Sequence, residues 1–235
     1  MLKYWIWLST RQNVSGAQEI ALLSRFGSAV AIYQADEEAL KRGSEAPVPP
    51  SLLDKSLTGA EVILQQCYQK NIHVMTIQDA QYPARLRSID DPPIVLYYKG
   101  VFPAIDTSPV IAMVGTRKAS AYGLMQAKRL GYQVAKSGGI VVSGGAEGID
   151  TMCLTGALSA NRPVIAVLGC GADVVIPGPA QLFAEQAEQV WVVVHQKKFG
   201  IIDGSHSVRV PLCVFLHYTT NGPAEQRFAE NLRPN

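Results

Sequence analysis

Small and basic residues follow directly after an apolar run of the chain. Gly115 ends the run at 110–114, and Thr116, Arg117 and Lys118 come next. Glycine lets a backbone come close to an anion and exposes its N–H groups. Arginine can hold a phosphate through two parallel hydrogen bonds, and lysine adds a second positive charge. These residue types in this order predict a phosphate-binding loop.

A second glycine-rich segment, 143–150, follows another apolar run, and a third, 169–173, follows the next one. A helix is expected to start at Ile149, and its N-terminus would add the positive end of a dipole. The first two loops together predict a surface that binds phosphate groups. The glycines of the second loop are Gly144, Gly145 and Gly148.

Several kinds of enzyme site are disfavoured by the same residues. Ser143 lacks the G-x-S-x-G pattern of a nucleophile, and no histidine is placed to activate it. The second loop reads G-G-x-x-G rather than G-x-G-x-x-G, so a nicotinamide site has only weak support. The sequence also lacks the Walker A lysine motif of ATP-binding loops. Asp150 at a helix start is expected to interact with the dipole rather than act as acid or base. We therefore predict no catalytic residue, cofactor or metal site.

The elements that must position these loops alternate between strand and helix. Strands are predicted at 110–114, 140–142 and 164–168, and helices at 121–136 and 149–160. The run at 110–114 is continuously apolar, as in a strand covered on both faces. This βαβαβ order predicts an α/β fold, a Rossmann-like parallel sheet with helices on both faces. Ligands of such sheets bind beyond the carboxyl ends of the strands, where the glycine-rich loops fall.

The chain is predicted to have three parts. Residues 1–70 form a helical N-terminal module of about four short helices, with helical patterns at 17–26, 29–40 and 52–70. Residues 71–189 form an incomplete Rossmann-like domain that opens with strands at 73–76 and 94–99. Residues 190–235 are a tail of uncertain structure, in which 191–194 and 212–218 could be strands.

The composition indicates the general class of protein but does not identify a binding partner. The chain has 235 residues, of which 48% are hydrophobic and 17% charged, as expected of a soluble globular protein. A net charge of +2 neither requires nor excludes an anionic partner. The four cysteines show no CxxC spacing, so we expect reduced, mostly buried thiols. Because no signal segment or membrane span is evident, we expect a cytoplasmic protein without a membrane partner.

Residues 71–176 resemble the DNA-processing proteins called DprA or Smf. The likeness runs through ordered segments: Asp-Ala-Gln-Tyr-Pro-Ala-Arg-Leu at 79–86, Asp-Pro-Pro-Ile-Val-Leu-Tyr at 91–97, Val-Gly-Thr-Arg-Lys-Ala-Ser-Ala-Tyr-Gly at 114–123, Val-Ser-Gly-Gly-Ala-Glu-Gly-Ile-Asp at 142–150 and Val-Leu-Gly-Cys-Gly-Ala-Asp-Val-Val at 167–175.

The resemblance implies a non-enzymatic protein that binds single-stranded DNA with little sequence preference. Such proteins protect incoming DNA in natural transformation and help load the RecA recombinase, and they often dimerise. The implied DNA-phosphate contacts, with Lys118 added from its charge and position, are Gly115, Thr116, Arg117, Lys118, Ser143, Gly144, Gly148 and Ile149.

The chain departs from the family pattern at several places. Glu147 stands where the family commonly has arginine, and Leu154 where it commonly has histidine. The family's Ser-Glu-Tyr-Pro-Pro-Gly and Phe-Pro-x-Arg-Asn-Arg segments are absent, and residues 190–235 show no counterpart. We therefore expect a gene truncated or frame-shifted near residue 190. The downstream DNA tests this expectation.

Two other classes of function remain open. One is a nucleotide-processing enzyme of the phosphoribohydrolase type, which shares a related core, although its Pro-Gly-Gly-x-Gly-Thr motif is absent here. The other is an inactive, truncated remnant.

Overall fold

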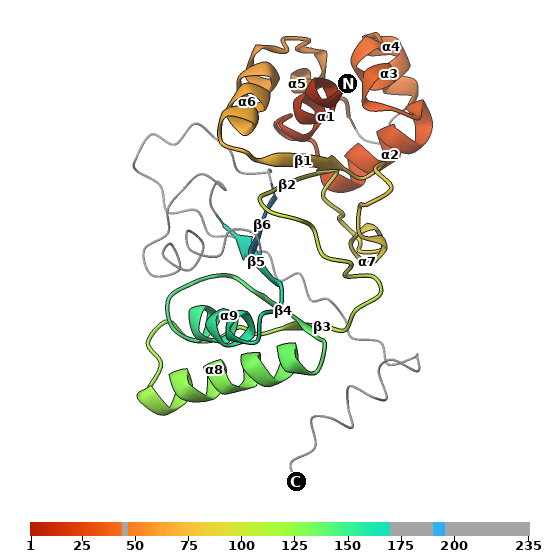
Figure 1. The fold of residues 1–235 in the computed structure, drawn as a ribbon. Helices are drawn as coiled ribbons and strands as arrows, with labels where there is room; N and C mark the ends of the chain where they lie inside the picture. Colours follow the sequence, from red (N-terminus) through yellow and green to blue (C-terminus); the bar gives the residue numbers. More distant parts are fainter. Residues whose placement is uncertain (44–46, 170–189, 196–235) are drawn as a thin grey trace. The chain divides into compact units, whose positions relative to one another are not determined.

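The computed structural model describes residues 1–43, 47–169 and 190–195 (Figure 1). One compact unit contains Met1–Tyr97, and the described residues of Tyr98–Val194 form a second. A compact unit is not by itself an independently folding domain, so the division predicted at 70/71 and 189/190 stays a prediction. Among the described residues, no helix is long and apolar enough to cross a membrane.

Helices dominate the first 70 residues, as the sequence predicts, but the described residues there form six helices rather than about four, and the one at Leu2–Ser9 was not predicted. The predicted helix at 29–40 is wrong as one element, because Asp36 accepts a hydrogen bond from the Ala39 N–H and starts a new helix. The pattern at 52–70 is likewise divided, by the segment 54–57. The helices are α1 (Leu2–Ser9), α2 (Gly16–Phe26), α3 (Ala29–Gln34), α4 (Glu37–Arg42), α5 (Pro50–Leu53) and α6 (Thr58–Gln69).

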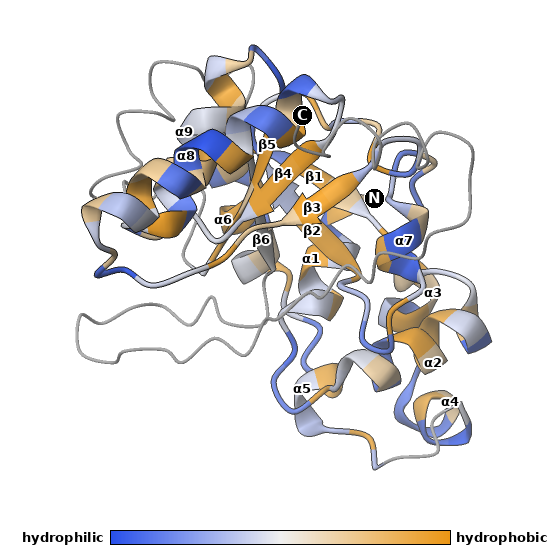
Figure 2. Ribbon diagram, turned by 90° about the horizontal axis from the view of Figure 1, so that it is seen from below, coloured by the Kyte–Doolittle hydropathy of each residue, from blue (hydrophilic) through white to orange (hydrophobic). Residues whose placement is uncertain are grey.

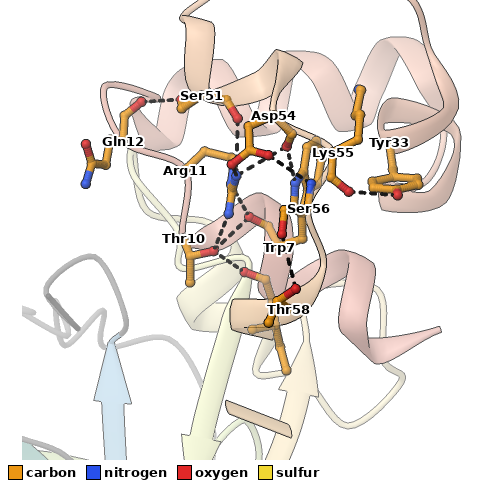
Figure 3. Close-up of polar contacts among 11 residues, drawn as sticks. Trp7, Thr10, Arg11, Gln12, Tyr33, Ser51, Asp54, Lys55, Ser56 and Thr58 are labelled. Atoms are coloured by element: carbon orange, nitrogen blue, oxygen red, sulfur yellow. Dashed lines mark hydrogen bonds and ion pairs between the residues drawn. The ribbon is translucent and has the colours of Figure 1, made fainter. Parts of the chain in front are cut away.

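A tryptophan at the centre of this unit fixes the connection between α5 and α6 (Figure 3). The fully buried Trp7 donates from Nε1 to the Asp54 carbonyl at 2.9 Å. The Arg11 guanidinium lies 5.2 Å and the Lys55 Nζ 5.1 Å from the Trp7 ring. Tyr33 donates its hydroxyl to the Lys55 carbonyl at 2.9 Å. Burial lowers the pKa of both cations, and the cluster serves to hold the helices together.

Two neighbouring strands complete the first unit, and both are confirmed: β1 (His73–Thr76) and β2 (Val95–Tyr98). The connection between them contains the short helix α7 (Ala84–Arg87). In this connection the Tyr82 hydroxyl is buried and donates to the Pro93 carbonyl at 2.7 Å. Burial raises the pKa of Tyr82.

The second unit is a parallel sheet with crossover helices, which confirms the predicted α/β class with a Rossmann-like sheet. In the described part of the chain the two crossover helices pack against each other on one face of this sheet, rather than on both faces as predicted. The strands lie in the order β6-β5-β4-β3, and all three neighbouring pairs are parallel. Its elements are β3 (Val110–Ala112), α8 (Ala121–Lys136), β4 (Ile140–Ser143), α9 (Ile149–Ser159), β5 (Val164–Leu168) and β6 (Val190–His195).

Helices α8 and α9 pack side by side on this sheet, and Figure 2 shows the hydrophobic strands β3 to β5 beside them. The two helices approach closely because each has a glycine in the contact. A Cβ at Gly131 would collide with the backbone of Cys153, and one at Gly156 would collide with the backbone of Lys128. The predicted buried thiols are confirmed at Cys67 and Cys153, whereas Cys170 and Cys213 lie outside the described residues.

Three local predictions need correction. The strand at 110–114 ends at Ala112, and Val114 is 75% exposed, because β3 is the last strand in the order and the chain leaves the sheet there. The helical period of 121–136 places Leu130 on the same side as Ala127 and Val134, which are buried, but Leu130 is 48% exposed. Residues 190–195, assigned to the tail, form β6 and pair with β5, which confirms the strand at 191–194. The possible strand at 212–218 lies outside the described residues.

Candidate nucleic-acid interface

The two loops singled out in the sequence lie against each other at the carboxyl ends of β3 and β4. The Gly115 N–H donates to the Asp150 Oδ1 at 3.1 Å. The Ile149 N–H donates to the Thr116 carbonyl at 3.3 Å. These bonds join the loop after β3 to the start of α9, so residues thirty-five positions apart in the chain form one surface.

Glycines are required at this junction. Gly148 has a φ of 94°, a conformation that other residues rarely adopt, and a Cβ there would collide with the Thr116 carbonyl. A Cβ on Gly115 would lie 2.7 Å from the Ile149 side chain. The glycines thus allow the close approach of two backbones, in addition to any role toward a ligand.

Arg117 and Lys118 lie at the exposed end of the first loop. The Thr116 hydroxyl accepts from the Lys118 N–H at 3.2 Å, which shapes the turn. Ser120 then caps α8 by accepting from the Gly123 N–H at 3.2 Å. Within the described residues, no carboxylate forms an ion pair with either cation. Two side chains with full positive charge are therefore available to an anion from solvent.

Asp150 connects the loops and is only 6% exposed. Its carboxylate sits in the first turn of α9, as predicted from the helix dipole, and it also binds the Gly115 amide. No pattern in the sequence predicts this second contact, which joins two different βα units. Because the Gly115 N–H is used here, that amide is not available to a phosphate in this conformation.

Ser143 differs from its predicted role. It is 3% exposed, and its hydroxyl donates to the Met113 carbonyl at 2.7 Å. The neighbouring Cys153 donates its thiol to the Asp150 carbonyl at 3.0 Å, and burial raises the pKa of this thiol to about 11. The Ser143 side chain thus fixes the end of β4 and cannot reach a ligand on the loop surface.

The two departures from the family pattern fall in different environments. Glu147 is exposed in the second loop, where its negative charge faces solvent. Leu154 is 2% exposed and packs in the interior. Glu147 therefore bears on the charge of the candidate interface, and Leu154 bears on packing.

Of the eight predicted site residues, the exposed ones are Gly115, Thr116, Arg117, Lys118 and Gly144, the partly exposed ones are Gly148 and Ile149, and the buried one is Ser143. The arrangement offers two exposed cations beside a helix N-terminus. This combination is better suited to bind a backbone phosphate than a base edge, because it supplies positive charge without a specific pattern of hydrogen-bonding groups for a base.

A family model described as DNA recombination-mediator protein A matches residues 73–201, more than half of the chain and both loops. The chain belongs to this family. The match confirms the resemblance to DprA and Smf proteins, and it extends beyond the predicted end of the likeness at 176.

Curated DprA and Smf proteins align with parts of the chain. Protein Smf of Synechocystis sp. is 33% identical over 140 residues, which are 58% of this chain and 35% of that protein. DNA processing protein DprA of Bacillus subtilis is 34% identical over 115 residues, 49% of this chain and 39% of that protein. The chain thus spans less than half the length of these relatives.

A solved DprA structure agrees with the fold. The crystal structure of DNA processing protein A from Streptococcus pneumoniae superposes with a TM-score of 0.65 and 26% identity. The superposition covers 83% of this chain and 68% of that one. The chain therefore has the fold of the DprA family to which it belongs.

Proposed function

We propose that this chain binds single-stranded DNA, with little sequence preference, through the loops after β3 and β4. The observation that carries the proposal is the exposed Arg117 and Lys118 pair on a loop joined to the N-terminus of α9. Contacts to phosphates give affinity without reading sequence. Arg117 and Lys118 bind phosphates, Thr116, Gly144, Gly148 and Ile149 line the path, and Gly115 shapes it.

The wider role is proposed from family membership. We propose that the bound strand is protected in natural transformation and handed to the RecA recombinase, in the cytoplasm and without a catalytic step. A homodimer is part of this proposal.

The runner-up functions make different predictions. A nucleotide hydrolase would release base or phosphate from nucleotides. Ser143, the buried serine of the two loops, donates its hydroxyl hydrogen bond to a backbone carbonyl instead of facing a substrate. An inactive remnant would show no cooperative thermal transition by circular dichroism. Binding of oligonucleotides with a cooperative melt and no nucleotide turnover favours the proposed function over both.

The direct test is fluorescence anisotropy with a labelled oligo(dT) of 20 nucleotides across a range of salt concentrations. We expect affinity to fall steeply with salt, because each phosphate contact to a single strand contributes about 0.7 to the slope of log K against log salt. Oligonucleotides of other sequences should bind within a few-fold. No binding at low salt overturns the proposal.

A further inference from the structure

Helix α8 carries basic and aromatic residues on its solvent face, and none of them belongs to the loop site proposed above. Between Thr107 and Ala146 the sequence has five basic residues and no aspartate or glutamate. Arg117 and Lys118 belong to the loop, and the other three basic residues lie on α8: Lys128, Arg129 and Lys136. The positive charge of the loop therefore continues along the helix that follows it.

The spacing on α8 forms a line. Tyr122, Arg129 and Lys136 are seven residues apart, nearly two helical turns each, so they share one face. The opposite face packs inward through Ala127, Val134 and other buried residues. From Tyr122 to Lys136 the line spans about 21 Å at 1.5 Å per residue.

The apolar members of this face are exposed to an unusual degree. Tyr122 is 68% exposed and Met125, one turn further, is 57% exposed. Tyr132 is 38% exposed, with the Lys136 Nζ 5.7 Å from its ring. Large side chains left in solvent beside cations are typical of surfaces on which bases stack while the backbone follows the charges.

We infer that the strand held at the loops continues along α8, with Tyr122 stacking a base and Arg129 and Lys136 binding phosphates. The inference rests on the proposed function and extends it from a single phosphate site to a path. Charge complementarity selects the occupant, because a polyanion fits a face without carboxylates. At 3.4 Å per stacked nucleotide, about 21 Å corresponds to about six nucleotides.

Oligonucleotides of two lengths distinguish binding at the loops alone from binding that continues along α8. We would measure anisotropy of labelled oligo(dT) of 4 and 20 nucleotides on the full chain and on Arg129→Gln/Lys136→Gln. The double variant should bind the 20-mer at least tenfold more weakly and reduce its salt slope by about 1.4, two contacts at about 0.7 each. Binding of the 4-mer should change less than twofold.

Tyr122→Leu tests stacking separately from charge. Loss of one base–aromatic stack should weaken binding of the 20-mer by about 5- to 100-fold and leave its salt slope unchanged. Matched controls are Arg162→Gln, an exposed arginine at the amino end of β5, and Tyr68→Leu, an exposed tyrosine on α6. Both controls should bind like the parent chain.

The outcomes distinguish this inference from the proposed function. If the parent binds the 20-mer and Arg117→Ala weakens it, but the α8 variants bind like the parent, the path is wrong and the loop site stands. If the parent binds neither oligonucleotide, both fail. If the α8 variants alter the mass of the particle in light scattering and leave the salt slope intact, the face binds a second copy of the chain and the path is wrong.

Discussion

At the scale of single residues, Gly148 decides whether the two loops can meet. Its φ of 94° and its approach to the Thr116 carbonyl exclude any side chain. We predict that Gly148→Ala weakens binding of the 20-mer at least tenfold, because the first loop is pushed away from α9. Anisotropy measures the affinity, and urea denaturation measures the stability.

Gly138 provides the matched control for this substitution. It has a φ of 90° in the same unit, but a Cβ there meets nothing within 4 Å. Gly138→Ala should cost about 1–2 kcal/mol of stability from backbone strain alone and leave the affinity unchanged. Equal affinities for the two variants would contradict the role of Gly148.

Glu147 is the one carboxylate exposed on the second loop, and it opposes the proposed binding. We predict that Glu147→Arg raises affinity for single-stranded DNA about 2- to 10-fold, because exposed charges each contribute about 0.2–1 kcal/mol. The gain should vanish at high salt. Glu147→Gln should give a smaller gain. An unchanged or reduced affinity for the arginine variant would place the DNA away from this loop.

Cys153 gives a pH dependence with a defined sign. Burial raises the pKa of its thiol from 9.0 to about 11 in the folded chain, so the folded state keeps its proton longer than the unfolded state does. Stability from this group is complete below pH 9 and lost as pH rises toward 11.

Relative to Cys153→Ala, the parent chain should lose up to about 3 kcal/mol over that interval, since each pKa unit corresponds to about 1.4 kcal/mol. Urea denaturation from pH 8 to 11 measures the difference. Tyr82 and the lysines also contribute to the pH dependence, but they are common to both proteins and cancel in the comparison. If the stabilities of the parent and Cys153→Ala change in parallel with pH, the thiol is not buried.

At the scale of elements, the contact between α8 and α9 depends on two glycines. We predict that Gly131→Ala lowers the free energy of unfolding by about 2–3 kcal/mol, because its methyl group must displace the Cys153 backbone. Alanine's helix propensity, about 1 kcal/mol better than glycine's, offsets part of this cost. Urea denaturation measures the change.

Gly59 on α6 is the control, since a Cβ there meets nothing within 4 Å. Gly59→Ala should leave stability unchanged or slightly raised. If Gly131→Ala behaves in the same way, the two helices are further apart than the structure has them.

The sequence predicted these elements well where a pattern is local. The helix at 121–136 and the strands at 73–76 and 164–168 have the predicted bounds, because apolar period and glycine stops act within a few residues. The segment 29–40 is divided because Asp36 caps a new helix instead of continuing the previous one. The spacing of apolar residues does not distinguish these two roles of an aspartate.

The site was predictable in its charges and not in its internal bonds. Arg117 and Lys118 are exposed, as their type and place after a strand suggest. The burial of Ser143 and the bond from the Gly115 amide to Asp150 depend on contacts between distant βα units. Such contacts leave no spacing signal in one sequence. The run without acids around α8 was a signal of a wider basic surface.

At the scale of the whole molecule, a net charge of +2 conceals an uneven distribution. The loop after β3 and the helix α8 hold five cations without a carboxylate. Local charge of this kind attracts a polyanion even when the total is small, and the attraction depends strongly on salt. Binding by this chain is therefore expected to be electrostatic in origin and tolerant of sequence.

The most direct measurement of the central claim is the salt dependence of oligo(dT) binding by Arg117→Ala beside the parent chain. Arg162→Gln serves as a control of equal charge change. We predict that Arg117→Ala lowers affinity at least tenfold at low salt, for every oligonucleotide sequence, and reduces the salt slope by about 0.7. An Arg117→Ala variant with the parent's affinity and slope would contradict it.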